Sequence, residues 1–273
     1  MMLERMPCGR WYFPQTIQNK RSVIPIKYLG SKSRIAKHIV PILQKEIDDN
    51  NINTYIEPFC GGCNLVDKIE CDKRIANDNN PYLIALLDHV ARGGGLRDTI
   101  SRDYYNKAKV AWKNNDLSEF EKWELGAIGF LASFNGKGFR GGYAKPGYEK
   151  TKTGLRYRDY YREAKDNLLK QAPHLYGIEF SCRDYQEIDT TQNALIYCDP
   201  PYMNTTGYST SSCFDYGKFW QTMRDWSQNN IVYISELQAP DDFECVWEQE
   251  VSRSINASDK SKAVEKLFRY KGE

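Results

Sequence analysis

The sequence lacks the features that mark membrane-spanning, secreted or zinc-dependent proteins. Its 273 residues hold no apolar run near the roughly 20 residues of a membrane helix. Residues 1–20 lack the uninterrupted apolar core of a secretory signal. Only three histidines occur, and Cys60-Gly-Gly-Cys63 has no second CxxC pair, so structural zinc is disfavoured. We expect the eight cysteines to be free thiols in a reducing cytoplasm.

Net charge is also small, at +2, but it is unevenly distributed. Residues 137–170 contain ten lysines or arginines against four acids, a net charge of +6, so the remainder carries −4. Aromatic residues such as Tyr143, Tyr148 and Tyr157 interleave with the basic ones. This pattern is typical of a nucleic-acid-binding surface, and a solvated charged face is the alternative.

Strand and helix patterns alternate on both sides of a helical block. Helices are predicted at residues 31–47 and 81–90, and strands at 53–57, 74–78, 177–181, 194–198, 231–235 and 266–270. After Gly93-Gly94-Gly95 the pattern becomes helical to about residue 134, with Ser118–Glu121 as an expected capping box. A glycine-rich loop or hairpin follows at residues 135–143. This order predicts an α/β sheet with an inserted, mainly helical domain.

Residues 199–202, Asp-Pro-Pro-Tyr, follow the apolar strand predicted at 194–198. The two prolines lack N–H groups, so the segment offers the Asp199 carboxylate and the Asp199 and Pro200 carbonyls as acceptors. Tyr202 adds a flat ring beside them. Acceptors next to a stacking surface suit an aromatic amine, above all the 6-amino group of adenine. Taken alone, such a motif is more commonly a strand cap and a turn.

The first predicted strand ends in a glycine turn at Gly61-Gly62, and the next strand ends in Asp78 about twenty residues later. Glycine lets the backbone approach a nucleotide-like ligand, and the acid suits a ribose hydroxyl pair. The turn is not GxGxxG, which favours S-adenosylmethionine over a dinucleotide. Lys32 precedes a predicted helix N-terminus, an arrangement that favours a carboxylate such as the methionyl group.

Taken in order, these motifs resemble those of the Dam-type, alpha-class DNA adenine methyltransferases. They are Lys27-Tyr-Leu-Gly-Ser-Lys32, Glu57-Pro-Phe-Cys-Gly-Gly-Cys63, Asn77-Asp78-Asn79, Asp184-Tyr185 and Asp199-Pro-Pro-Tyr202. The resemblance covers about residues 23 to 270. It implies a Rossmann-like methyltransferase sheet with an inserted, mainly helical target-recognition domain. We therefore expect an extension at 1–22, a catalytic domain at 23–93 and 163–273, and the insertion at 94–162.

The resemblance also implies roles for individual residues. The implied cofactor contacts are Tyr28, Lys32, Phe59, Gly61, Asp78, Asp184, Tyr185 and Asp199. The implied catalytic residues, which receive a flipped-out adenine, are Asp199, Pro200, Pro201 and Tyr202. Tyr28 stands where tryptophan is common in the family. Cys63 stands where glycine is usual, at a turn that calls for a positive φ.

The expected partner is double-stranded DNA, and a cognate restriction endonuclease is a further candidate. The residues expected to contact DNA are Asn135, Lys137, Arg140 and Lys145, and Arg140 suits either a base edge or a phosphate. One rival is a methyltransferase of the same fold that acts on RNA or on a protein amide. Another is a DNA-binding protein with a degenerate cofactor site, which the acids at 78 and 199 disfavour. A nicotinamide-dependent oxidoreductase is disfavoured by the glycine turn.

Overall fold

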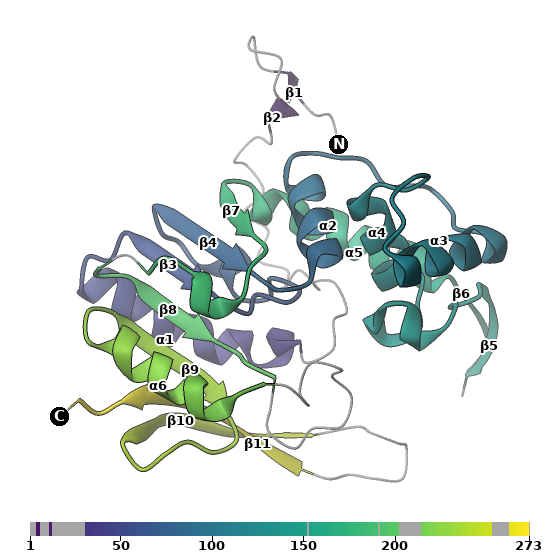
Figure 1. The fold of residues 1–273 in the computed structure, drawn as a ribbon. Coiled ribbons are helices and arrows are strands. Elements are labelled where there is room, and N and C mark those ends of the chain that lie inside the picture. Colours follow the sequence, from purple (N-terminus) through teal and green to yellow (C-terminus); the bar gives the residue numbers. More distant parts are fainter. Residues whose placement is uncertain are drawn as a thin grey trace. The chain divides into compact units, whose positions relative to one another are not determined.

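The computed structural model describes residues 4–5, 11–12, 31–151, 153–190, 192–201, 214–252 and 262–272. The chain forms two compact units, which are described separately below (Figure 1). The first contains Met1–Lys37, Gly61–Lys68 and Asn80–Cys182, and the second contains His38–Cys60, Ile69–Asn79 and Arg183–Glu273. Among the described residues, no helix combines the length and the apolar character that crossing a membrane requires.

The second unit is built on a mixed sheet. Its strands lie in the order β10-β11-β9-β8-β3-β4. Strands β4, β3, β8 and β9 run parallel to one another, whereas β11 pairs antiparallel with both β9 and β10. Their bounds are β3 (Thr54–Glu57), β4 (Lys73–Asn77), β8 (Leu195–Cys198), β9 (Ile231–Glu236), β10 (Phe243–Ser252) and β11 (Lys262–Tyr270).

The two faces of this sheet differ in chemistry because side chains alternate along each strand. On one face, α6 (Tyr216–Ser227) packs Phe219 and Met223 against an apolar layer that includes Ile196 and Ile234. On the other face lie tyrosines with hydrogen-bonded hydroxyls. Tyr55 donates to Glu57 (2.7 Å), Tyr197 lies 2.7 Å from the Ser235 hydroxyl, and Tyr233 donates to Glu46 of α1 (Ala36–Asp49) at 2.9 Å.

The first unit is mainly helical. Its helices are α2 (Pro81–Ala91), α3 (Arg102–Asn114), α4 (Lys122–Leu131) and α5 (Tyr160–Leu175). Its short 3-10 helices are η1 (Lys32–Arg34), η2 (Val66–Lys68), η3 (Phe134–Gly136) and η4 (Gly138–Gly141). Its strands are β1 (Glu4–Arg5), β2 (Trp11–Tyr12), β5 (Gly147–Thr151), β6 (Gly154–Arg158) and β7 (Ile178–Ser181). Strands β5 and β6 form an antiparallel hairpin.

Aromatic packing holds α2, α3 and the 134–143 loop together. Trp112 of α3 stacks on Tyr82 of α2, with ring centroids 3.9 Å apart, and meets Phe139 at 5.3 Å. Helix α4 approaches α2 so closely that a Cβ atom added at Gly126 would lie 2.1 Å from the Tyr82 carbonyl oxygen. Glycine is therefore a steric requirement at this crossing.

The predicted strands and helices are confirmed, within a few residues at their ends. The capping box predicted at Ser118–Glu121 is wrong. Helix α4 begins after Glu121, which makes no side-chain cap hydrogen bond. The Ser118 backbone N–H instead donates to the Asp116 carboxylate (2.9 Å), so Ser118 belongs to the turn that leaves α3. The expected domain boundaries at residues 94 and 162 stay a prediction.

We predict that Gly126→Ala will destabilise the protein by about 3 kcal/mol, because the new methyl group must displace the backbone of α2. Thermal unfolding of the purified variant measures this. Gly95→Ala is the matched control, since a Cβ atom there meets nothing within 4 Å. Equal melting temperatures for the two variants would contradict the close helix approach.

Candidate active site

Four acidic residues lie at the carboxyl ends of the parallel strands in the second unit. Glu57 is the last residue of β3 and Glu236 the last of β9, while Asp78 and Asp199 directly follow β4 and β8. Because parallel strands end at the same edge of a sheet, ligands of open α/β folds bind there. Glu57 and Glu236 are almost fully buried, and Asp78 and Asp199 are half-buried.

Asn77, the last residue of β4, connects three segments at this edge. Its buried side-chain amide donates to the carbonyl oxygens of Pro58 and Arg183, each at 3.0 Å, and its side-chain oxygen accepts from the Arg183 N–H at 3.1 Å. The Asn77 carbonyl also accepts from the Cys60 N–H (2.8 Å). One side chain therefore fixes the turn after β3 relative to the segment that carries the Asp184-Tyr185 motif.

Two predicted cofactor residues meet directly. The rings of Phe59, in the turn after β3, and Tyr185, in η5 (Tyr185–Glu187), have centroids 5.2 Å apart. Asp184 caps η5 by accepting from the Gln186 N–H at 3.0 Å and is exposed. Phe214 joins the cluster, 6.1 Å from Phe59 and 5.7 Å from Tyr185. This third ring belongs to none of the motifs identified in the sequence.

The Asp199–Pro201 corner follows β8. Burial raises the pKa of the Cys198 thiol well above its usual value, and the negative charges of Asp199 and Glu57 add to this effect. Burial, together with Asp199, likewise raises the pKa of the Tyr197 hydroxyl. Both groups therefore stay neutral at physiological pH. The Tyr216 hydroxyl donates to the Pro201 carbonyl at 2.5 Å.

Four other predicted site residues are not among the described residues of the second unit. Tyr28 and Tyr202 lie outside the described residues. Lys32 belongs to the first unit, where it is buried in η1, and Ser31 caps η1 by accepting from the Ser33 N–H. Gly61 also belongs to the first unit.

The glycine turn adopts the left-handed conformations expected of it. Gly61 has φ of 47° and Cys63 has φ of 54°, so the cysteine that stands at a usual glycine position adopts a positive φ. The buried side-chain amide of Gln171 on α5 donates to the Gly62 and Cys63 carbonyl oxygens, each at 3.0 Å. These bonds hold the strained turn in place.

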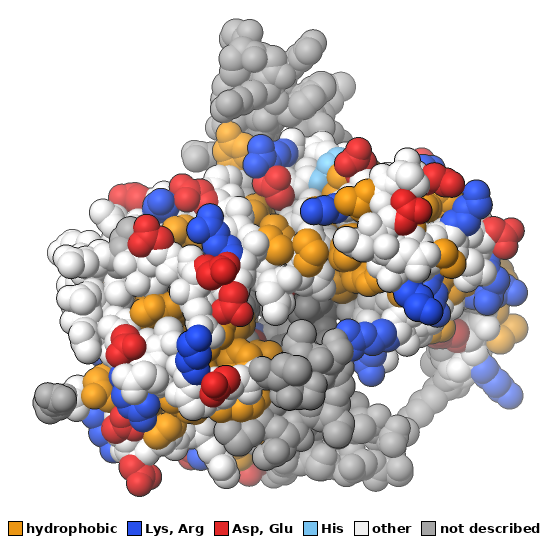
Figure 2. Space-filling view, in the orientation of Figure 1, with side chains coloured by type: hydrophobic (Ala, Val, Ile, Leu, Met, Phe, Trp, Pro, Cys, Tyr) orange, Lys and Arg blue, Asp and Glu red, His pale blue; other side chains and the backbone are white. Residues whose placement is uncertain are grey.

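The four residues expected to contact DNA are all exposed on the first unit: Asn135, Lys137, Arg140 and Lys145. Their loop is anchored from behind by the buried Phe139 ring and by the Phe134 N–H, which donates to the Gly142 carbonyl at 3.2 Å. On the face that Figure 2 shows, lysine and arginine side chains of the helical unit lie among acidic ones.

The β5–β6 hairpin exposes two rings. Tyr148 and Tyr157 are 73% and 56% exposed and pack edge to face at 5.3 Å. Arg158, by contrast, pairs with Glu163 at 2.8 Å, and the Tyr160 hydroxyl bonds to Glu149. These contacts anchor the base of the hairpin to α5, so not every cation of the basic segment is directed to solvent.

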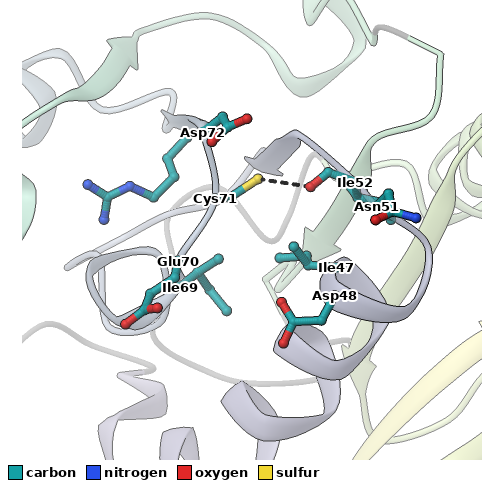
Figure 3. Close-up of a pocket in the computed structure, with 9 residues that line it drawn as sticks. Ile47, Asp48, Asn51, Ile52, Ile69, Glu70, Cys71 and Asp72 are labelled. Carbon is teal, nitrogen blue, oxygen red and sulfur yellow. Dashed lines mark hydrogen bonds between the residues drawn. The ribbon is translucent and has the colours of Figure 1, made fainter.

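A pocket of about 620 Å³ lies at the opposite ends of the strands (Figure 3). It is formed where α1 ends and where residues 69–72 lead into β4, and Cys71 there donates to the Ile52 carbonyl at 3.6 Å. None of the predicted site residues lines it. Within the described part of the chain, no cluster of three potential metal ligands occurs.

The mostly parallel sheet, with acidic residues and a proline corner at the carboxyl ends of its strands, is that of an α/β ligand-binding enzyme fold. Comparison with known families identifies the family. Residues 28–235 match the model of the D12 class N6 adenine-specific DNA methyltransferases. Since the match covers most of the chain, the protein belongs to this family.

Curated relatives agree with this assignment. The chain is 27% identical to the type II methyltransferase M.FokI of Planomicrobium okeanokoites, over 78% of this chain and 33% of M.FokI. It is 29% identical to the type II methyltransferase M.MjaIII of Methanocaldococcus jannaschii, over 68% of this chain and 72% of the relative. It is also 29% identical to the retron Ec67 DNA adenine methylase of Escherichia coli, over 68% of this chain and 66% of that methylase. The chain thus spans about a third of the length of M.FokI.

We predict that Asn77→Ala and Asn77→Asp will each weaken S-adenosylmethionine binding about tenfold and destabilise the fold by about 3 kcal/mol, because the Pro58 and Arg183 carbonyls lose their donor. Calorimetric titration and thermal unfolding measure the two effects. Asn79→Ala, at an exposed neighbouring position, is the control and should bind normally. Normal binding by both Asn77 variants would show that the three segments hold together without this amide.

Proposed function

We propose that the protein transfers a methyl group from S-adenosylmethionine to the 6-amino group of adenine at a specific site in double-stranded DNA. Family membership and the Asp199–Pro201 corner at the carboxyl end of β8 support this proposal. The corner is the observation that carries most weight, because it offers hydrogen-bond acceptors without an amide donor from either proline.

The residues of the second unit fit an adenosine-containing cofactor. The Phe59 and Tyr185 rings provide apolar faces for a purine, and Asp184 directly precedes Tyr185. Asp78 follows Asn77, whose side-chain amide bonds to the residues just before Phe59 and Asp184. We propose that Asp78 holds the ribose hydroxyls and that Asp184 and Tyr185 border the adenine. Tyr28, Lys32 and Gly61 complete the proposed set. When bound, S-adenosylmethionine supplies an electrophilic methyl group on a positively charged sulfur.

The proposed chemistry requires the target adenine to leave the DNA stack, because its amine is inaccessible within the duplex. Asp199 and the Pro200 carbonyl then accept the two amine hydrogens, and Tyr202 stacks on the base. Accepting both hydrogens directs the nitrogen lone pair out of conjugation with the ring. The Asp199 carboxylate also stabilises the positive charge that develops on the nitrogen. The nitrogen bonds to the methyl group as the methyl–sulfur bond breaks with its electron pair left on sulfur, and the nitrogen then releases one proton to solvent. No covalent intermediate with the enzyme is needed.

We assign DNA contact to Asn135, Lys137, Arg140 and Lys145 in residues 94–162, the proposed target-recognition insertion. Their exposure on one anchored loop supports this assignment. The lysines suit phosphates, whereas Asn135 and Arg140 also suit base edges. Because the proposed substrate is DNA, we expect action in the cytoplasm. A cognate restriction endonuclease is part of the proposal, since two of the relatives carry type II methyltransferase names.

The direct test is incubation of the purified protein with S-adenosylmethionine and unmethylated genomic DNA, followed by sequencing that detects N6-methyladenine. We expect modified adenines within one short sequence. Methylation of RNA or of a protein amide with unmodified DNA would favour the rival methyltransferase. Cofactor-independent DNA binding without methylation would favour the non-catalytic alternative.

We predict that Asp199→Ala will lower the methylation rate by on the order of a hundredfold or more, because a preorganised acceptor is lost at the reacting nitrogen. Asp199→Asn, which keeps the shape and loses the charge, should also be strongly impaired. Single-turnover methylation of an oligonucleotide that contains the target site measures both rates. Asp189→Ala, at an exposed position of the same unit, is the control. Near wild-type rates in the Asp199 variants would refute the role.

We predict that replacing Lys137 and Lys145 with alanine will weaken DNA binding for all sequences alike, because lysines neutralise phosphates without reading bases. The slope of log affinity against log salt concentration should fall by about 0.9 per lysine. Fluorescence anisotropy over a salt series measures the slope. Lys45→Ala, on α1 of the other unit, should leave it unchanged. An unchanged slope in the double variant would place the DNA surface elsewhere.

A further inference from the structure

The hydrogen bond between Tyr216 and Pro201 joins α6 to the corner after β8. Tyr216 is the first residue of α6, and Asp215 caps that helix by accepting from the Lys218 N–H at 2.9 Å. The Tyr216 ring packs edge to face against Phe214 at 4.9 Å and borders the apolar core. Its hydroxyl reaches the Pro201 carbonyl oxygen at 2.5 Å. The donor is thus carried by a capped helix and a packed ring.

This bond acts on the one backbone torsion that the two prolines leave free. Each proline ring fixes its own φ near −65°. Asp199 and Pro200 each precede a proline, which restricts both to extended geometry. Only the ψ angle of Pro201 is unrestricted, because the next residue is not a proline. Peptide planarity means that fixing the Pro201 carbonyl fixes the direction in which the chain leaves the corner.

The same bond also directs the Pro201 carbonyl oxygen toward Tyr216 and uses one of its two lone pairs. Asp199, Pro200 and Pro201 all carry oxygens that could accept from an amine, but an adenine amine has only two hydrogens. Burial and the nearby Glu236 carboxylate raise the pKa of the Tyr216 hydroxyl, which therefore stays protonated and remains a donor. Pro201 is engaged by Tyr216, whereas Asp199 and Pro200 keep the roles proposed above.

We propose that Tyr216 is a positioning residue for methyl transfer: its hydroxyl turns the Pro201 carbonyl toward α6, sets the exit of the chain from the corner, and leaves Asp199 and Pro200 to hold the target amine. The inference rests on the proposed function and adds a residue outside the family motif to it.

The test compares Tyr216→Phe with Tyr233→Phe. Each variant loses one tyrosine hydroxyl bond in the same unit, but the Tyr233 bond runs to Glu46 on the opposite face of the sheet from α6. Four quantities are measured: the single-turnover rate at saturating DNA and cofactor, the dissociation constant for S-adenosylmethionine, the melting temperature, and the fluorescence of 2-aminopurine at the target position.

We expect Tyr216→Phe to lower the saturated rate by on the order of fivefold, with cofactor affinity unchanged. Tyr233→Phe should keep the wild-type rate, even if its melting temperature falls as much as that of Tyr216→Phe. With 2-aminopurine at the target position, Tyr216→Phe should also change the fluorescence of the bound base.

Two results would overturn the inference while the proposed function stands: a wild-type rate and fluorescence in Tyr216→Phe, or equal rate losses in both variants. If the wild-type protein methylates no adenine, the proposed function fails and the inference falls with it.

Discussion

The buried amide of Asn77 is the contact on which the architecture of the site depends. Its hydrogen bonds to Pro58 and Arg183 join segments that are 19 and 106 residues away in the sequence. Those segments carry Phe59 on one side and Asp184-Tyr185 on the other, and the two rings then meet. A buried amide left without its partners is costly, so the three segments are stable only together. Phe59 and Tyr185 are thus positioned before any ligand binds.

A second constraint comes from the charges that accumulate at the carboxyl ends of the strands. Burial raises the pKa of the Cys198 thiol, and the negative charges of Asp199 and Glu57 near the end of β8 raise it further. Below them, hydrogen-bonded tyrosines such as Tyr55 and Tyr197 fill one face of the sheet. A cluster of negative charge supported by neutral, buried donors suits the cationic sulfur and the amine of the proposed reaction.

The sequence was sufficient to predict the strands that carry the site, because apolar runs such as 194–198 end abruptly at proline or glycine. It did not predict β10 (Phe243–Ser252), whose charged residues mask the alternation of an edge strand, or helices α5 and α6. The capping box at Ser118 failed because Asp116 competes for the same backbone donor. Asn77 was visible as a neighbour of Asp78, yet its role depends on partners distant in the chain. Tyr216 carried no sequence signal, because its partner is a proline carbonyl.

The Asn77 amide couples the turn after β3 to the segment before η5. Amide hydrogen exchange, followed by NMR at single residues, tests it most directly. The Cys60 and Arg183 N–H groups, which donate to the carbonyl and side-chain oxygens of Asn77, should be protected to a similar degree. Added S-adenosylmethionine should raise both protections together. Rapid exchange at Arg183 alongside a protected Cys60, unchanged by the cofactor, would contradict the account.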